Sequence, residues 1–189
     1  MKRTFLAAAL LSLAAPAVSQ TSPADNAEMA EIVAADQAVR EGDGPVDGQA
    51  MVRADAERRH RTRELFDHGA LTTANDFYAA AFVFQHGAAP EDYLLAHVLA
   101  VRSLALGRTD AEWIAAASLD RYLHHTGKSQ VYGTQYQVDS GAVTMEPYDR
   151  ALLTDALRVA AGVHTVEEQE AHLAEATEIM KRFATPSKP

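Results

Sequence analysis

The sequence predicts a mainly α-helical fold, namely a compact array of about six or seven antiparallel helices with a small inserted β-hairpin. Three observations support this prediction. Apolar residues recur at helical spacing along most of the chain, capping signals and glycines separate the helical stretches, and β-prone alternation is confined to residues 129–146. The chain has 189 residues, of which 48% are hydrophobic, so it can form one domain with an apolar core.

Residues 1–19 are predicted to form a secretory signal peptide. Lys2 and Arg3 precede an apolar run that ends at Ala15, and small residues suited to cleavage follow at 17–19. A membrane anchor is the alternative, but a run of about eleven apolar residues is shorter than the ~20 that a spanning helix needs. We therefore expect an exported protein, periplasmic or secreted, without a stable membrane anchor.

The composition restricts the partners and the means of stabilisation. The sequence contains no cysteine, so packing alone must stabilise the single helical domain that we expect at 20–184, ahead of a disordered tail at 185–189. The formal net charge is -9, and a negative surface repels nucleic acid. The arginines within residues 54–67 are balanced by acidic residues, which predicts a solvated helix face. We therefore expect no nucleic-acid partner.

The first two helices are predicted from capping and periodicity. Asp25 and Glu28 form a capping-box pattern at the start of the first helix. Its apolar residues follow a helical period and are Met29, Ile32, Val33 and Val39. A glycine-rich stretch at 42–48 ends this helix, and a second helix runs to about Asp67.

A third helix is predicted after a break at 68–73. Its apolar stripe consists of Phe77, Ala80, Ala81 and Phe84. Gly87 suits a left-handed C-terminal cap, and Pro90 suits the first turn of a fourth helix. Residues 93–107 are apolar nearly all round, which predicts that the fourth helix is the central helix of the array.

A fifth helix is predicted to start with a capping box of Thr109 and Glu112 and to end at Gly127. The Gly-Lys-Ser triplet that begins at Gly127 resembles part of a phosphate-binding loop. That motif needs a glycine where Tyr122 stands, and it needs a strand where the sequence predicts a helix. We therefore interpret Gly127 as the end of a helix.

The β-prone segment is predicted to form a hairpin that turns at residues 139–141. Pro147 is then predicted to open a helix that Gly162 closes. Thr165 and Glu168 form a capping box for the last helix. The stripe of that helix consists of Leu173, Ala176, Met180 and Phe183.

Two carboxylates fall inside apolar stripes. At the helical period, Asp120 lies on the apolar face of the fifth helix, and Asp36 lies with Arg40 on that of the first. A buried carboxylate is costly unless it is paired and hydrogen-bonded. Two interpretations stay open. In one, Asp36 pairs with Arg40, and Asp120 pairs with Arg121 or a hairpin amide, as structural locks; in the other, these groups line a ligand pocket.

Four short stretches resemble a family of mostly bacterial proteins known as a domain of unknown function. They are DQAVR (36–40), FQHG (84–87), LDRYL (119–123) and GKSQVYGTQY (127–136). The family is similar in carrying a Gln-His pair, an Asp-Arg pair and a Gly-Lys-x-Gln-x-Tyr-Gly-Thr-Gln run, and the resemblance covers about 29–160. It brings no activity with it. The resemblance implies one constellation of candidate binding residues: Asp36, Arg40, Gln85, His86, Asp120, Arg121, Gln130, Tyr132 and Gln135.

The last of these stretches has side chains that suit recognition of an amide or a sugar. Gln130 and Gln135 can donate and accept hydrogen bonds, and Tyr132 offers a ring and a hydroxyl. Gly133 predicts either a bulge or the close approach of another backbone or a ligand. The alternative is that these side chains satisfy the ends of helices beneath the hairpin.

The sequence provides little for catalysis. It has no cysteine nucleophile, no Gly-x-Ser-x-Gly elbow and no His-Glu-x-x-His helix. Glu168 and His172 share a helical face, but we expect a surface ion pair there and not a metal site. We expect a non-catalytic binding or interaction module, with an unknown envelope ligand or protein partner and without cofactor or metal. The alternative is a metal-independent hydrolase or lyase that acts on an envelope glycan or peptide through His86 with Asp36 or Asp120.

Overall fold

The computed structural model describes most of the chain, namely residues 23–42, 47–139 and 142–184. The predicted signal peptide at 1–19, the predicted tail at 185–189 and two residues of the predicted turn, 140–141, lie outside the described residues. The side chain of Phe183 in the predicted last stripe lies outside them as well.

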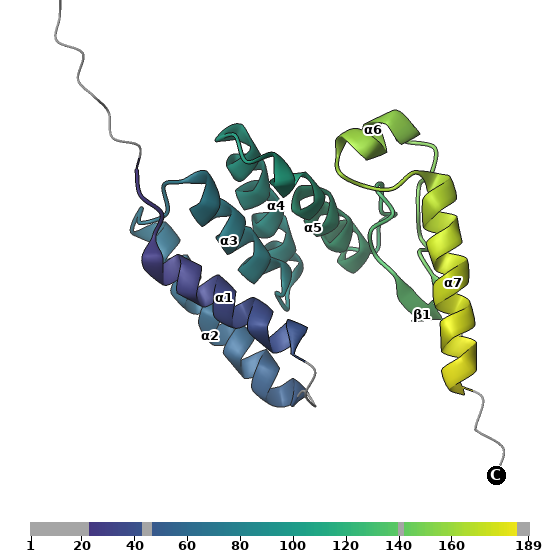
Figure 1. Ribbon diagram of the computed structural model, residues 1–189, viewed down its shortest axis with the longest axis horizontal. Coiled ribbons are helices and arrows are strands. Elements are labelled where there is room, and N and C mark those ends of the chain that lie inside the picture. Colours follow the sequence, from purple (N-terminus) through teal and green to yellow (C-terminus); the bar gives the residue numbers. More distant parts are fainter. Residues whose placement is uncertain (1–22, 43–46, 140–141, 185–189) are drawn as a thin grey trace, which may run out of the picture.

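The helices and strands follow the predicted order. They are α1 (Ala27–Glu41), α2 (Gly48–Asp67), α3 (Ala74–Gln85), α4 (Pro90–Ala105), the 3₁₀ helix η1 (Thr109–Ala111), α5 (Glu112–His125), β1 (Gln137–Asp139), β2 (Ala142–Thr144), α6 (Asp155–Ala160) and α7 (Val166–Ala184). Figure 1 shows α1 and α2 together at one end of the molecule, then α3, α4 and α5, with α7 at the other end. The prediction of a mainly α-helical array with a small inserted hairpin is confirmed.

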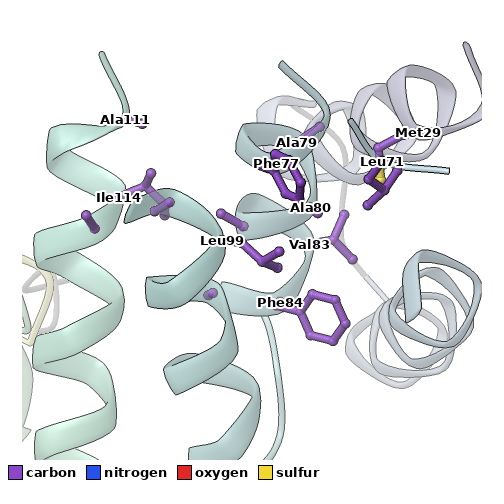
Figure 2. Packing of buried hydrophobic residues seen from close by; sticks show 14 of the residues in the cluster. Met29, Leu71, Phe77, Ala79, Ala80, Val83, Phe84, Leu99, Ala111 and Ile114 are labelled. Atoms are coloured by element: carbon purple, nitrogen blue, oxygen red, sulfur yellow. The ribbon is translucent and has the colours of Figure 1, made fainter. Parts of the chain in front are cut away.

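The core lies where α3 packs against α1 and α4, and where α4 packs against α5. Small side chains let these helices approach closely, because Ala80, Ala96 and Ala100 have no exposed surface. Larger buried side chains such as Leu99 and Ile114 fill the space between helices. Figure 2 shows buried side chains from α1, α3, α4 and α5 directed into this core.

Helix α4 is less enclosed than its composition predicts. One face carries the buried residues, but Leu94, Val98 and Val101 on another face are 38%, 55% and 45% exposed. Helix α3 is instead the most enclosed element, since eight of its 12 residues are buried. Within the described part of the chain, no helix combines the length and the apolarity needed to cross a membrane.

Several predicted helix starts are wrong, by a few residues at α1 and α5 and by more at α6. The N-cap of α1 is Asn26 and not Asp25, and the side chain of Asn26 accepts a hydrogen bond from the Met29 N–H at 2.9 Å. Thr109 lies in η1, and α5 begins without a side-chain cap. Pro147 follows a cis peptide bond and does not open a helix, because α6 begins only after Thr154, which caps it.

The predicted helix ends are mostly confirmed. Gly127 and Gly162 have φ of 71° and 66°, the left-handed conformation expected of C-terminal glycines. The prediction of a left-handed cap at Gly87 is wrong, because Gly87 does not have a positive φ. A Cβ at Gly87 would lie 2.2 Å from the Cβ of Asp92, so glycine is required there by the close approach of α4.

The hairpin is shorter than predicted. Strands β1 and β2 pair antiparallel over three residues each, with Val138 opposite Val143. The β-prone residues before β1 do not form a strand. They form a loop at 129–136, which is joined to the rest by an isolated bridge between Gln130 and Tyr148.

Candidate functional site

Asp36 occupies the centre of a polar network between α1, α2 and the end of α3. Its side chain is 1% exposed. Asp36 Oδ1 lies 2.9 Å from Arg40 Nη1, and Asp36 Oδ2 accepts from Gln37 Nε2 at 2.7 Å. His86 Nδ1 lies 3.0 Å from the same Oδ2. Because an ionised carboxylate only accepts, Nδ1 of His86 carries the hydrogen in this pair.

Helix α2 completes this network with one carboxylate, Asp55, and one guanidinium, Arg58. Asp55 accepts from Arg40 Nη2 at 2.8 Å and from Arg58 Nη2. Arg58 Nε lies 3.3 Å from Asp36 Oδ1, although it makes no hydrogen bond there. Two carboxylates thus face two guanidiniums, and the formal charges of these four groups cancel.

The surroundings of Asp36 hold it in the ionised form. Burial by itself would raise the pKa of Asp36. The hydrogen bond and charge of His86, the charge of Arg40 and the hydrogen bond from Gln37 outweigh burial, and the pKa stays below its ordinary value of 3.8. Asp36 is therefore an anion at neutral pH, and three side chains that it contacts stabilise that charge.

The C-terminus of α3 connects four helices. Arg121 of α5 donates to the Gln85 carbonyl at 2.6 Å, Arg59 of α2 donates to the His86 carbonyl at 2.8 Å, and Tyr93 of α4 donates to the carbonyl of the next glycine at 2.9 Å. The last carbonyls of a helix have no partner within the helix. Here each of three consecutive carbonyls receives a donor from a different neighbouring helix, which fixes the relative positions of all four.

Asp120 is held in a different manner. It has no exposed surface, and its oxygens accept from the backbone N–H groups of Val131, Tyr132 and Thr134 at 2.7, 3.1 and 3.0 Å. The Thr134 hydroxyl adds a bond of 2.9 Å. Within the described residues, no cation pairs with Asp120. The loop amides anticipated as one alternative are therefore its partners, and Arg121 is not.

Two glutamines hold the loop, Gln130 by bonds within the loop and to Met145, and Gln135 by bonds to α5. Gln130, which has no exposed surface, donates to the carbonyls of Gln135, at 2.9 Å, and of Met145, and it accepts from the Gln135 N–H at 2.9 Å. The side chain of Gln135 accepts from Arg121 Nε at 3.0 Å and donates to the Ala117 carbonyl at 3.1 Å. The side chain of Gln135 thus satisfies groups in the middle of α5, and not the helix ends that the alternative named.

A third polar cluster was missed in the sequence. Arg158 is 1% exposed and donates from Nε to the Tyr148 hydroxyl at 2.9 Å, and that hydroxyl lies 2.8 Å from Gln169 Oε1. A Cβ at Gly133 would lie 2.5 Å from Gln169 Oε1, so the protein itself fills the space beside this glycine. The sequence contained one signal of this cluster, because Arg158 stands among apolar residues of α6, next to Leu157.

The structure arranges the nine candidate residues as two linked networks. Asp36, Arg40 and His86 form the first network, and Asp120 belongs to the second. The second also holds Gln130, Gln135 and Arg121, and Tyr132 contributes through its backbone. Gln85 contributes its carbonyl, through which Arg121 joins the end of α3. Within the described residues, no hydrogen bond or ion pair joins either Asp36 or His86 to Asp120.

An open cavity lies elsewhere, between α1 and α3, and is here called the α1–α3 cleft. Its volume is about 380 Å³, within the usual range of roughly 300–1,000 Å³ for small-molecule pockets. Its walls are largely apolar: Met29, Ala30, Val33, Tyr78, Ala79 and Phe82. The sequence signal was that α3 carries Tyr78 and Phe82, four residues apart, on the side opposite its buried stripe.

The rim of the α1–α3 cleft carries fixed polar groups. Asp25 accepts from Asn75 Nδ2 at 2.7 Å, and Asn75 Oδ1 accepts from Arg108 at 2.8 Å. The hydrogen bonds from Thr73 and Asn75 lower the pKa of Asp25. The Arg108 guanidinium lies 3.5 Å from the centroid of the Tyr78 ring. An apolar ligand in the cleft would therefore meet an ordered polar edge.

The histidines and acids form no metal site among the described residues. His164 Nδ1 lies 3.7 Å from Glu168 Oε2, whereas His172 contacts the ring of His164 at 4.8 Å. The predicted surface pair thus involves His164 in place of His172. Comparison of the chain with protein families, with curated proteins and with solved structures found no match.

Proposed function

We propose that this chain is an exported, non-catalytic binding module of the cell envelope, and that its ligand occupies the α1–α3 cleft. The observation that carries the proposal is the cleft itself, a preformed and largely apolar hollow of about 380 Å³. Preformed apolar pockets with a few convergent polar groups are typical of ligand sites. The chemistry of the walls favours a small ligand with an apolar body and a polar group that meets the rim.

The polar networks support a structural role for the candidate residues. The carboxylate oxygens of Asp36 and Asp120 accept from protein donors that surround them, and neither carboxylate lines the α1–α3 cleft. Buried hydrogen-bond networks of this kind rigidify the fold. The first network still borders the cleft, because Gln37 lines it and donates to Asp36 at 2.7 Å.

Binding of the uncharged, polarity-sensitive dye Nile red tests the proposal. We expect a saturable rise in dye fluorescence with the unaltered protein. Ala30 lines the cleft from an exposed position, so Ala30→Phe should fill the cleft without disturbing the core and should weaken binding by about tenfold.

The matched control is Ala35→Phe. Ala35 is exposed on the same helix and does not line the cleft. Equal loss of binding in the two variants, or no saturable binding at all, would contradict the assignment of the cleft.

A hydrolase or lyase remains the second candidate because of one contact. His86 Nδ1 lies 3.0 Å from Asp36, as in an acid–base pair, and within the described residues His86 Nε2 has no protein partner. The His86 side chain is 19% exposed, so solvent reaches it. Release of soluble fragments from envelope glycan or peptide, absent in His86→Gln, would support this activity. Equal release by both proteins would exclude His86 as the base.

A further inference from the structure

A second hollow lies on the other side of the molecule, between the start of α5, the loop before β1 and the start of α7. We call it the Trp113 pocket. Its volume is about 230 Å³. It is lined by Trp113, Gly133, Thr134, Tyr136, Gly162, Val163, His164, Gln169 and His172. None of these residues lines the α1–α3 cleft, so the two hollows are separate.

Aromatic rings dominate the wall of the Trp113 pocket. Trp113 and Tyr136 are 46% and 45% exposed, so a ligand can reach both rings. The rings of His164 and His172 lie 4.8 Å apart and nearly perpendicular. Four of the nine lining residues therefore present a ring.

The pocket also offers hydrogen-bonding groups without permanent charge. No Asp, Glu, Lys or Arg is among its lining residues. Within the described residues, the indole N–H of Trp113, the hydroxyl of Tyr136 and the ring of His172 make no hydrogen bonds. The nearby Glu168 carboxylate accepts from the backbone and hydroxyl of Thr165 at 2.8 and 2.9 Å, which holds it as a helix cap.

The floor of the pocket is rigid. Gln169 is 1% exposed, and both ends of its amide are bonded, to the Tyr132 carbonyl at 2.6 Å and to the Tyr148 hydroxyl at 2.8 Å. Gly133 is pressed against Tyr148 and Gln169, with φ of 80°. A ligand would therefore meet a surface that is already formed, which lowers the entropy lost on binding.

We propose that the Trp113 pocket binds a neutral sugar ring. Aromatic faces pack against the C–H faces of a sugar, while uncharged donors and acceptors bond its hydroxyls. The volume is below the roughly 300 Å³ at which pockets for drug-sized ligands begin, so it suits a single ring or the end of a chain. The lining contains no Lys or Arg, which disfavours anions. Aromatic walls can also bind quaternary ammonium ions, and the titration with choline below distinguishes that outcome.

Tryptophan fluorescence tests this proposal directly, because Trp113 is the single tryptophan of the sequence. The full chain is titrated with glucose, N-acetylglucosamine and their β-linked disaccharides, and in parallel with choline chloride. We expect a saturable change in emission with at least one saccharide and none with choline. A response to choline alone, or no saturable response to any of these compounds, would overturn the proposal.

Variants locate the response. Tyr136→Ala keeps the fluorescent reporter, and it should raise the saccharide Kd by about tenfold, because a stacking face is lost. His172→Ala changes a second exposed group of the pocket and should also weaken binding. Phe66→Ala is the control, since Phe66 is 37% exposed on α2 and lies outside the pocket. Unchanged affinity in both pocket variants, or the same loss in Phe66→Ala, would refute the assigned site.

Discussion

At the scale of single residues, the two carboxylates predicted to face inward, Asp36 and Asp120, are neutralised in different ways. Asp36 faces the guanidiniums of Arg40 and Arg58, whereas Asp120 faces backbone N–H groups. Removing one member of a buried ion pair is costly because its partner stays charged. Removing the charge of Asp120 instead leaves oriented amides without a full set of acceptors.

The first residue-scale prediction concerns Asp36→Asn. This change leaves Arg40 and Arg58 without one counter-charge and should lower the free energy of unfolding by about 2–4 kcal/mol in urea titrations. The loss falls at the lower end of the range for buried pairs because the two arginines are 21% and 12% exposed. Glu31→Gln, at an exposed position of the same helix, should change stability by less than about 0.5 kcal/mol.

The difference in stability between the unaltered protein and Asp36→Asn should depend on pH. The folded-state pKa of Asp36 lies below its ordinary 3.8, so its charge stabilises the fold above that pH, and the stabilisation is lost as the pH falls through the folded-state pKa. The stability difference between the unaltered protein and Asp36→Asn should therefore shrink below pH 3.8. Urea titrations at successive pH values measure it, and a difference that grows in acid would contradict the sign.

At the scale of elements, the turn between α3 and α4 depends on one glycine. Gly87→Ala would place a Cβ 2.2 Å from the Cβ of Asp92, which caps the backbone of Ala88 at 3.0 Å. The turn must open, and we expect a loss of about 1–3 kcal/mol in stability. Gly48→Ala is the control, because nothing lies within 4 Å of that site. It should be neutral or slightly stabilising, and equal losses in the two variants would refute the steric reason.

The elements were predictable to the extent that periodicity and caps determine them. The helical period identified the helices and two of the four carboxylates buried in the described residues, Asp36 and Asp120. It missed the other two, Asp55 and Asp76. Thr165 with Glu168 marked the start of α7 correctly. The start of α1 was predicted one residue too early, because Asp25 and Asn26 are both good N-cap residues and stand side by side. Pro147 was wrongly predicted to open a helix, because proline is also suited to irregular turns. The loop before β1 was taken for strand because its β-prone residues bond to Asp120, a long-range contact that local propensity does not encode.

At the scale of the whole molecule, the candidate site was predicted only in part. The nine residues predicted as one centre all take part in hydrogen bonds, but they form two networks, and only Asp36, Gln85, Asp120 and Gln130 are buried. Tyr78 and Phe82 mark an apolar face of α3, but the sequence could not show the α1–α3 cleft, because a cleft depends on how far α1 and α3 lie apart at Val33 and Tyr78. It could not place Trp113 beside Tyr136 either, since loop packing brings them into one pocket.

Hydrogen exchange should divide the molecule into two parts. Among residues 166–180 of α7 only Gln169 is buried, whereas most of α3 is buried. Amides of α7 should therefore exchange about tenfold or more faster than those of α3 and α4. Asp120→Asn should accelerate α7 further, because the loop that Asp120 holds also contacts Gln169. Mass spectrometry of exchanged peptides measures both effects.

The contrasting variant for exchange is Asp36→Asn. It should accelerate α1 and α2, which share the first network, and leave α7 unchanged. Acceleration of the whole chain by either variant would show that the two networks form a single cooperative unit, against the separation described above.

The way in which Asp120 is held has a consequence for ionic strength. Mobile ions screen charges that solvent reaches, such as Arg61 with Glu28, which are 47% and 44% exposed. Asp120 has no exposed surface, and its donors are backbone amides that dissolved salt does not displace. At high salt concentration, the hydrogen bonds between Asp120 of α5 and the loop before β1 therefore keep their strength. The ion pair between Arg61 of α2 and Glu28 of α1 is weakened by screening.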